Sequence, residues 1–155
     1  MSSGKVTDLF FLDEATALAA GHRPCGRCNK VRFDQFVEAW KAVRGLNTVS
    51  AEEIDDELNE HRTNGSEQVT YRAQAAELPT GGMIRELGRP QPLLLFRYEH
   101  PKDQEHWCVY PWTSHGYGVK ETRPVGEVEV LTPEPTVDVI LTGFLPGPEL
   151  PLLAW

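Results

Sequence analysis

The chain has 155 residues, a formal net charge of −8, 40% hydrophobic residues and three cysteines. This composition is typical of a soluble globular domain that buries a core, and the negative charge disfavours a broad nucleic-acid surface. We expect a cytoplasmic location and no membrane partner, because no segment is typical of a signal peptide or a bilayer span and three cysteines are too few for a disulfide framework.

The first third of the sequence predicts two helices around a turn. A short helix begins after Asp13, which is a good N-cap, and stops at Gly21. A second helix is expected over residues 31–43, with apolar side chains at helical spacing and Gly45 as its end. Two aromatic residues on one face of this helix are expected to pack in the core: Phe36 and Trp40.

A third helix is predicted to follow the capping box that begins at Ser50 and to run to about Arg62. In a capping box the first residue and Glu53, three positions later, each bond the other's backbone N–H. The larger apolar residues of this segment are Ile54 and Leu58 alone, so we expect the helix to lie on the surface and to expose its carboxylates.

The rest of the sequence alternates short apolar runs with turn residues, which is typical of strands and hairpins. Gly81-Gly82 is a strong turn signal. Five segments are predicted to contain the strands: residues 69–71, 78–84, 93–98, 107–112 and 128–131.

A last helix is predicted after residue 131, with Thr132 as its N-cap, Pro133 as its first residue and Gly143 as its end. The tail over residues 144–155 is expected to pack irregularly. Helices in the N-terminal third, strands in the remainder and a C-terminal helix predict the α+β class. We expect two parts, residues 1–46 and 47–155, packed as one domain.

The most informative stretch lies between the first two helices, where Cys25 and Cys28 are separated by two residues. Three interpretations are open. The pair could supply two thiolates to a tetrahedral zinc ion, it could be a redox pair, or it could be two thiols in an ordinary turn. The pair follows a helix rather than the strand that precedes a thioredoxin-type pair, and this context favours the metal.

The segment from Phe11 to Cys28 resembles the second half of the zinc-binding domain of the Ada family of alkylation-repair proteins. An Ala-rich helix is followed by Gly21-His22-Arg23-Pro24-Cys25 and, after two residues, by a second cysteine, with His22 at the family's aromatic position. The remainder of the chain is similar to uncharacterised bacterial proteins that carry such a turn.

This resemblance implies a zinc-binding protein with a link to DNA repair or DNA binding. Cys25 and Cys28 correspond to structural ligands of the family's four-cysteine site. The cysteine that accepts a methyl group lies upstream in the family, and the residues before Phe11 contain none, so methyl-acceptor activity is not expected. Residues 1–50 contain seven Lys or Arg against five Asp or Glu, and four of these cations are candidate DNA-backbone contacts: Arg23, Arg27, Lys30 and Arg32.

The remaining metal ligands are left open by the sequence. Cys108 is a candidate third ligand, with one of the five histidines as the fourth, although its place in a predicted strand favours a buried free thiol. The alternative function is an enzyme with its site in the strand-rich region and a structural or vestigial cysteine turn. The sequence favours a binding module over an enzyme.

Overall fold

The computed structural model describes residues 11–99 and 105–147, and these residues form the predicted α+β fold. Within these ranges the helices are α1 (Glu14–Ala19), α2 (Lys30–Arg44), α3 (Ala51–Arg62), the 3₁₀ turn η1 (Ala75–Glu77) and α4 (Glu134–Leu141). The strands are β1 (Thr63–Asn64), β2 (Glu67–Gln68), β3 (Tyr71–Gln74), β4 (Met83–Glu86), β5 (Leu93–Glu99), β6 (Glu105–Thr113), β7 (Gly116–Tyr117), β8 (Glu121–Thr122) and β9 (Glu127–Val130).

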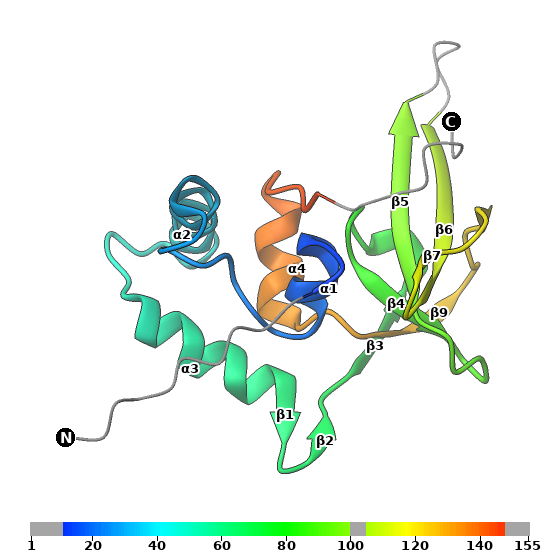
Figure 1. Ribbon diagram of the computed structural model, residues 1–155, viewed down its shortest axis with the longest axis horizontal. Coiled ribbons are helices and arrows are strands. Elements are labelled where there is room, and N and C mark those ends of the chain that lie inside the picture. The colour runs from blue at the N-terminus through cyan, green and yellow to red at the C-terminus, as the bar shows by residue number, and fades with distance from the viewer. Residues whose placement is uncertain (1–10, 100–104, 148–155) are drawn as a thin grey trace.

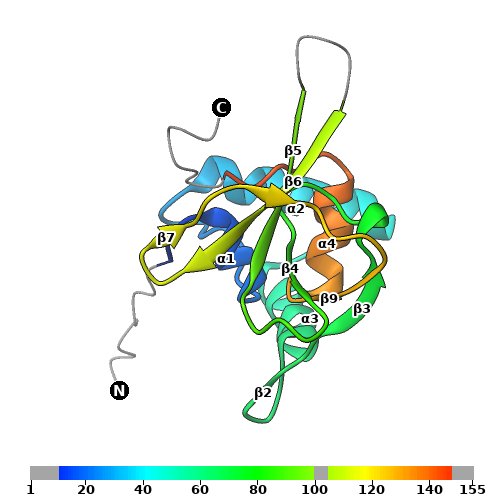
Figure 2. The same ribbon diagram turned by 90° about the vertical axis from the view of Figure 1, so that its right-hand side faces the viewer.

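The main sheet of the described residues is antiparallel, in the order β3-β9-β4-β5-β6-β7, with β8 also paired to β6. Strand β9, which comes late in the chain, lies between β3 and β4. It therefore joins β3 to the rest of the sheet. The helices α2, α3 and α4 lie to one side of the sheet, with α4 between the sheet and the pair α2 and α3 (Figure 1). Figure 2, in which the sheet faces the viewer, shows these helices behind it.

Buried apolar side chains form three clusters. The first lies between one face of the sheet and α4: Ile84, Leu93, Leu95, Val109, Val128, Val130 and Val137. The second joins the helices: Leu18, Phe36, Trp40, Ile54, Leu58, Val139, Ile140 and Phe144. The third covers the opposite face of the sheet: Ala15, Met83, Leu94, Cys108, Tyr110, Tyr117 and Leu131. Residues from both predicted parts of the chain therefore share the second and third clusters.

Local sequence signals set the ends of the first three helices. Asp13 caps α1, and its side chain accepts the N–H of Thr16 at 2.8 Å. Gly45 ends α2 with a left-handed φ of 62°. The capping box at Ser50 begins α3, as the sequence predicts. Phe36 and Trp40 are buried, and α3 buries only its narrow apolar face.

The predicted cap of the last helix is wrong. Pro133 occupies the N-cap position of α4, and no side chain caps the helix. Thr132 is fully buried, and its hydroxyl accepts the N–H of Met83 at 2.9 Å. The Thr132 hydroxyl, which the sequence pattern predicts to cap α4, therefore bonds the backbone of β4 instead.

The strands differ from prediction mainly at their ends. The segment predicted over residues 78–84 is a turn through Gly81-Gly82 that becomes β4 only at Met83. The first predicted strand lies two residues later, in β3, and the small β1–β2 hairpin has no counterpart in the prediction. The long apolar strands β5 and β6 lie where the sequence places them. Residues 148–155 of the predicted tail lie outside the described residues.

Candidate functional site

Residues 21–28, the cysteine turn, connect α1 to α2 and expose both of their thiols. The Cys25 carbonyl accepts the N–H of Asn29 at 2.9 Å, and the Cys25 Sγ accepts the N–H of Cys28 at 3.4 Å. Cys25 and Cys28 are both solvent-exposed. A Cβ on Gly26 would lie 3.2 Å from the Phe33 ring, so the glycine lets this ring pack under the turn. The turn is thus a defined structure with its sulfur atoms facing outward.

Backbone dipoles favour the ionised form of Cys25. The N–H of Cys28, followed by the N–H of Arg27, lowers the pKa of the Cys25 thiol below its ordinary value. Amide donors around sulfur stabilise the thiolate, which is the form that binds metal ions and acts as a nucleophile.

One close packing contact and one ion pair hold the cysteine turn against α3. Gly21 has a φ of +79°, and an added Cβ there would lie 2.6 Å from Cδ of Arg62, whose stem crosses the glycine. One residue before the Pro-Cys step, Arg23 donates to Asp55 of α3 at 2.8 Å. Its guanidinium also lies 5.0 Å from the centroid of the Phe33 ring, so the turn is fixed to both α2 and α3.

Two of the four predicted DNA contacts, Arg23 and Arg32, are held against other helices by ion pairs and are partly buried. Arg23 is the residue that pairs with Asp55, and its side chain is only 17% exposed. Arg32 donates to Glu14 of α1 at 2.7 and 3.0 Å and lies over the Phe144 ring. Because each guanidinium is paired with a carboxylate of the same chain, its electrostatic attraction for a DNA phosphate is weakened.

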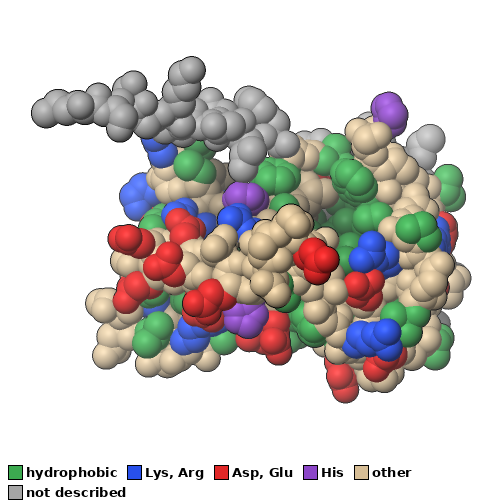
Figure 3. Space-filling model, turned by 90° about the horizontal axis from the view of Figure 1, so that it is seen from below, with side chains coloured by type: hydrophobic (Ala, Val, Ile, Leu, Met, Phe, Trp, Pro, Cys, Tyr) green, Lys and Arg blue, Asp and Glu red, His purple; other side chains and the backbone are tan. Residues whose placement is uncertain are grey.

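The other two predicted contacts extend into solvent. Arg27 is exposed at the tip of the cysteine turn, and Lys30 is 74% exposed although it pairs with Asp34 one helical turn away. The neighbouring α3 exposes five carboxylates: Glu52, Glu53, Asp55, Asp56 and Glu60. On the face shown in Figure 3, acidic side chains gather toward the side where α3 lies, and basic ones are interspersed with them. This face offers no broad basic surface.

Cys108 lies in a different environment from the cysteine turn. It belongs to the third core cluster, under α1, and its thiol donates to the Phe96 carbonyl at 3.6 Å. Burial raises the pKa of the Cys108 thiol. Within residues 11–99 and 105–147, no group of three or more His, Cys, Asp or Glu side chains could hold a metal ion. The structure therefore does not assemble the predicted set of three cysteines and a histidine among these residues.

His22 packs rather than projecting toward solvent. Its ring lies 5.2 Å from the Phe11 ring, and its Nε2 is 3.4 Å from a guanidinium nitrogen of Arg62. Burial, followed by the charge of Arg62, lowers the pKa of His22. A hollow of about 360 Å³ beside the turn is lined by these two side chains together with Cys25 and Asp55.

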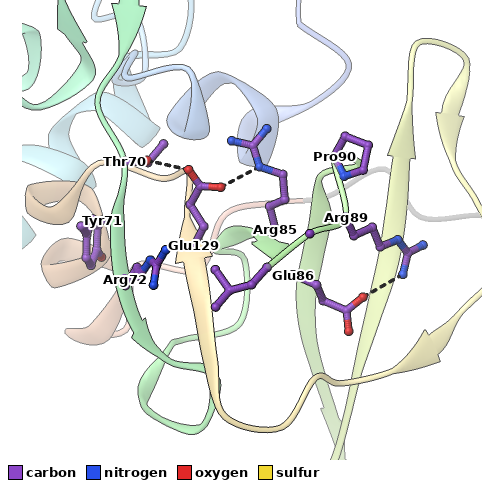
Figure 4. Close-up of a pocket in the computed structure, with 10 residues that line it drawn as sticks. Thr70, Tyr71, Arg72, Arg85, Glu86, Arg89, Pro90 and Glu129 are labelled. Atoms are coloured by element: carbon purple, nitrogen blue, oxygen red, sulfur yellow. Dashed lines mark hydrogen bonds and ion pairs between the residues drawn. The ribbon is translucent and has the colours of Figure 1, made fainter.

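A second hollow, of about 550 Å³, lies on the sheet surface across β3, β9 and β4 (Figure 4). The central Glu129 accepts from Arg85 at 2.8 Å and from Thr70 at 2.7 Å. The bond from Arg85, followed by that from Thr70, lowers the pKa of Glu129. A carboxylate held in its charged form is a weak proton acceptor, so Glu129 is poorly tuned for acid–base catalysis at neutral pH.

None of the site residues predicted from sequence lies in this sheet hollow. Its signal is the charge alternation in two strands, with Glu127 and Glu129 in β9 and Arg72 in the adjacent β3. That alternation predicts only a solvated strand face, because the pairing of β9 between β3 and β4 brings the charges together and is not encoded locally.

The described fold and turn define a mixed α+β protein with an exposed Cys-x-x-Cys pair and a third, buried thiol. Comparison of the chain with models of protein families, with curated proteins and with solved structures gives no match. Among the described residues, no helix has the length and apolar character needed to cross a membrane.

Proposed function

We propose that this chain is an Ada-like zinc-binding protein in which Cys25 and Cys28 supply two thiolate ligands. The observation that carries the proposal is the turn itself, in which both sulfurs are exposed and the Cys25 Sγ accepts the N–H of Cys28 at 3.4 Å. Amide hydrogen bonds to sulfur are the outer contacts that orient and stabilise thiolate ligands. A cytoplasmic location, where thiols stay reduced, is part of the proposal.

The rigidity of the turn favours a metal over a redox role. Arg23 fixes the segment before Cys25 to α3 through Asp55, and α2 begins two residues after Cys28. A preorganised pair of ligands loses little conformational entropy when it binds an ion. Methyl transfer forms no part of the proposal, since these two cysteines correspond to structural ligands.

Metal analysis of the reduced, purified chain tests this function. We expect zinc to remain bound through gel filtration and to be lost in Cys25→Ser and in Cys28→Ser. The matched control is Cys108→Ala, which removes the buried thiol and should leave the zinc content unchanged. A wild-type content below about 0.2 equivalents of zinc per chain would contradict the proposal.

The link to DNA is proposed only through the exposed cations of the cysteine turn, Arg27 and Lys30. Each phosphate contact releases counterions and adds about one to the slope of log affinity against log salt. In fluorescence anisotropy with duplex DNA, Arg27→Ala/Lys30→Ala should therefore reduce this slope by about two. Arg72→Ala, which removes an exposed arginine of the sheet, is the control. Equal slopes in the wild type and the double variant would contradict the link.

The alternative is an enzyme that uses the sheet hollow around Glu129. Its size lies within the range of about 300–1,000 Å³ that is typical of small-molecule sites, which is the observation in its favour. The fully bonded, charged carboxylate supports recognition of a polar ligand more than proton transfer. Loss of turnover of a candidate substrate in Arg85→Ala, with zinc content unchanged, would favour this alternative.

A further inference from the structure

The cysteine turn presents half of a tetrahedral site to solvent. A structural zinc ion takes four ligands, and Cys25 and Cys28 offer two from one exposed turn. Resting on the zinc-binding function above, we propose that two copies of the chain bind one zinc ion between their cysteine turns. Cys25 and Cys28 of each copy then complete a site of four thiolates.

Two-fold symmetry suits this arrangement. In a symmetric dimer the same surface of each copy meets the other across the axis, so an ion on that axis receives an identical pair of ligands from each side. The cysteine turn can make this approach without refolding, because Arg23 bonds it to Asp55 of α3, and the pair of Arg32 with Glu14 joins the two helices that flank it. The thiols lose their protons as they bind, and no oxidation is involved.

The charges on the turn complement the site. Four thiolates around one Zn²⁺ carry a net double negative charge, which is costly without nearby cations. Each copy contributes exposed Arg27 at the tip of the turn and Lys30 at the first residue of α2. In the dimer these cations surround the metal–thiolate centre, and their mutual repulsion is offset by its charge.

Apolar side chains next to the turn supply contact surface for the second copy. Val31 is 67% exposed three residues after Cys28, in the first turn of α2. Phe11 is 38% exposed and packs on His22, at the start of the turn. An apolar rim around exposed ligands is the surface that a symmetric partner would bury.

A zinc titration followed by analytical ultracentrifugation tests the proposal, with the full chain kept under reductant. We expect the mass to double as zinc approaches about one ion per two chains and to return to the monomer value in EDTA. Excess zinc should dissociate the dimer, because each chain then holds its own ion. A chain that stays monomeric at every ratio of zinc to protein while it binds about one zinc ion would overturn the shared site and leave zinc binding intact, whereas a chain that binds none would overturn both.

Matched variants locate the contact. Cys28→Ser should abolish the zinc-dependent doubling of mass while circular dichroism stays unchanged, since the residue is exposed, and Cys108→Ala should dimerise as the wild type does. Val31→Lys should weaken the dimer by about tenfold or more relative to Val125→Lys, which places the same change at a fully exposed valine outside the turn. Equal dimer affinities for these two lysine variants would contradict the predicted contact surface.

Discussion

The cysteine turn and strand β6 each contain cysteine, and the two regions give the thiol opposite properties. At the turn, Cys25 is exposed, and backbone N–H groups lower its pKa. In β6, Cys108 is buried under α1, and burial raises its pKa. The turn is held by long side chains that bridge helices, whereas β6 is held by its pairing with β5 and by core packing on both faces of the sheet. Reactivity follows from these surroundings and not from residue type.

The largest expected effect is the difference in alkylation rate between the two regions. With iodoacetamide in the native chain, Cys108 should react at least about 100-fold more slowly than Cys25, because its modification requires local opening of the core. Mass spectrometry of tryptic peptides over time measures both rates. The rates should converge in denaturant, and bound zinc should protect Cys25 and Cys28 but not Cys108. Comparable native rates would remove the contrast between the regions.

Gly21→Ala should break the turn while sparing the sheet. The left-handed φ of +79° and the 2.6 Å approach of Arg62 together predict a loss of about 2–4 kcal/mol in the free energy of unfolding. The matched control is Gly65→Ala, which has a φ of +66° but no atom within 4 Å, so it should lose only about 1 kcal/mol. Urea denaturation measures both losses. If they are equal, the contact with Arg62 contributes nothing.

Glu129→Gln tests how much the charge of Glu129 stabilises the sheet. Loss of the charged bonds to Arg85 and Thr70 should cost about 1 kcal/mol at pH 7, discounted for their partial exposure. Because the folded pKa of Glu129 is lowered, its contribution is present above the ordinary glutamate pKa and is lost as pH falls through the lowered value.

The difference between wild type and Glu129→Gln in denaturant titrations should therefore shrink in acid. Glu127→Gln is the control, because its exposed pair with Arg72 should contribute less than about 0.5 kcal/mol. A pH-independent difference for Glu129→Gln would show that its charge does not stabilise the sheet.

The smallest effect is expected in α4, outside both regions. Burial raises the pKa of Asp138, so its contribution to stability is present at low pH and is lost as pH rises through the folded pKa. Asp138→Asn should therefore stabilise the chain at pH 7, by at most about 0.5 kcal/mol, with little effect near pH 3. Thermal unfolding at both pH values measures this. Glu134→Gln, at the exposed first turn of α4, should not stabilise. Destabilisation by Asp138→Asn at pH 7 would contradict the expected penalty.

Much of the helical framework follows from local sequence. The caps at Asp13 and Ser50 and the stop at Gly45 are encoded within a few residues, because a cap needs only its own side chain and the next turn of backbone. The apolar run that forms β5 likewise predicts a strand, and the structure adds that Leu93 and Leu95 are buried on one face and Leu94 on the other. Thr132 shows where local sequence fails to predict the structure. Its hydroxyl is expected to cap α4, but it accepts the N–H of Met83 in β4.

The sequence by itself determined the α+β class and the cysteine pair beside a helix, since both depend on spacing along the chain. The burial of Cys108, which its place in a predicted strand favoured, is confirmed. Only the tertiary structure decided which elements cover that thiol and which cations of the turn are already paired. Arg23 and Arg32 find their partners 32 and 18 residues away, and the core cluster that contains Cys108 includes Ala15 from the other end of the chain. Burial and long-range ion pairs depend on how elements pack, and that is the physical reason why local patterns could not assign them.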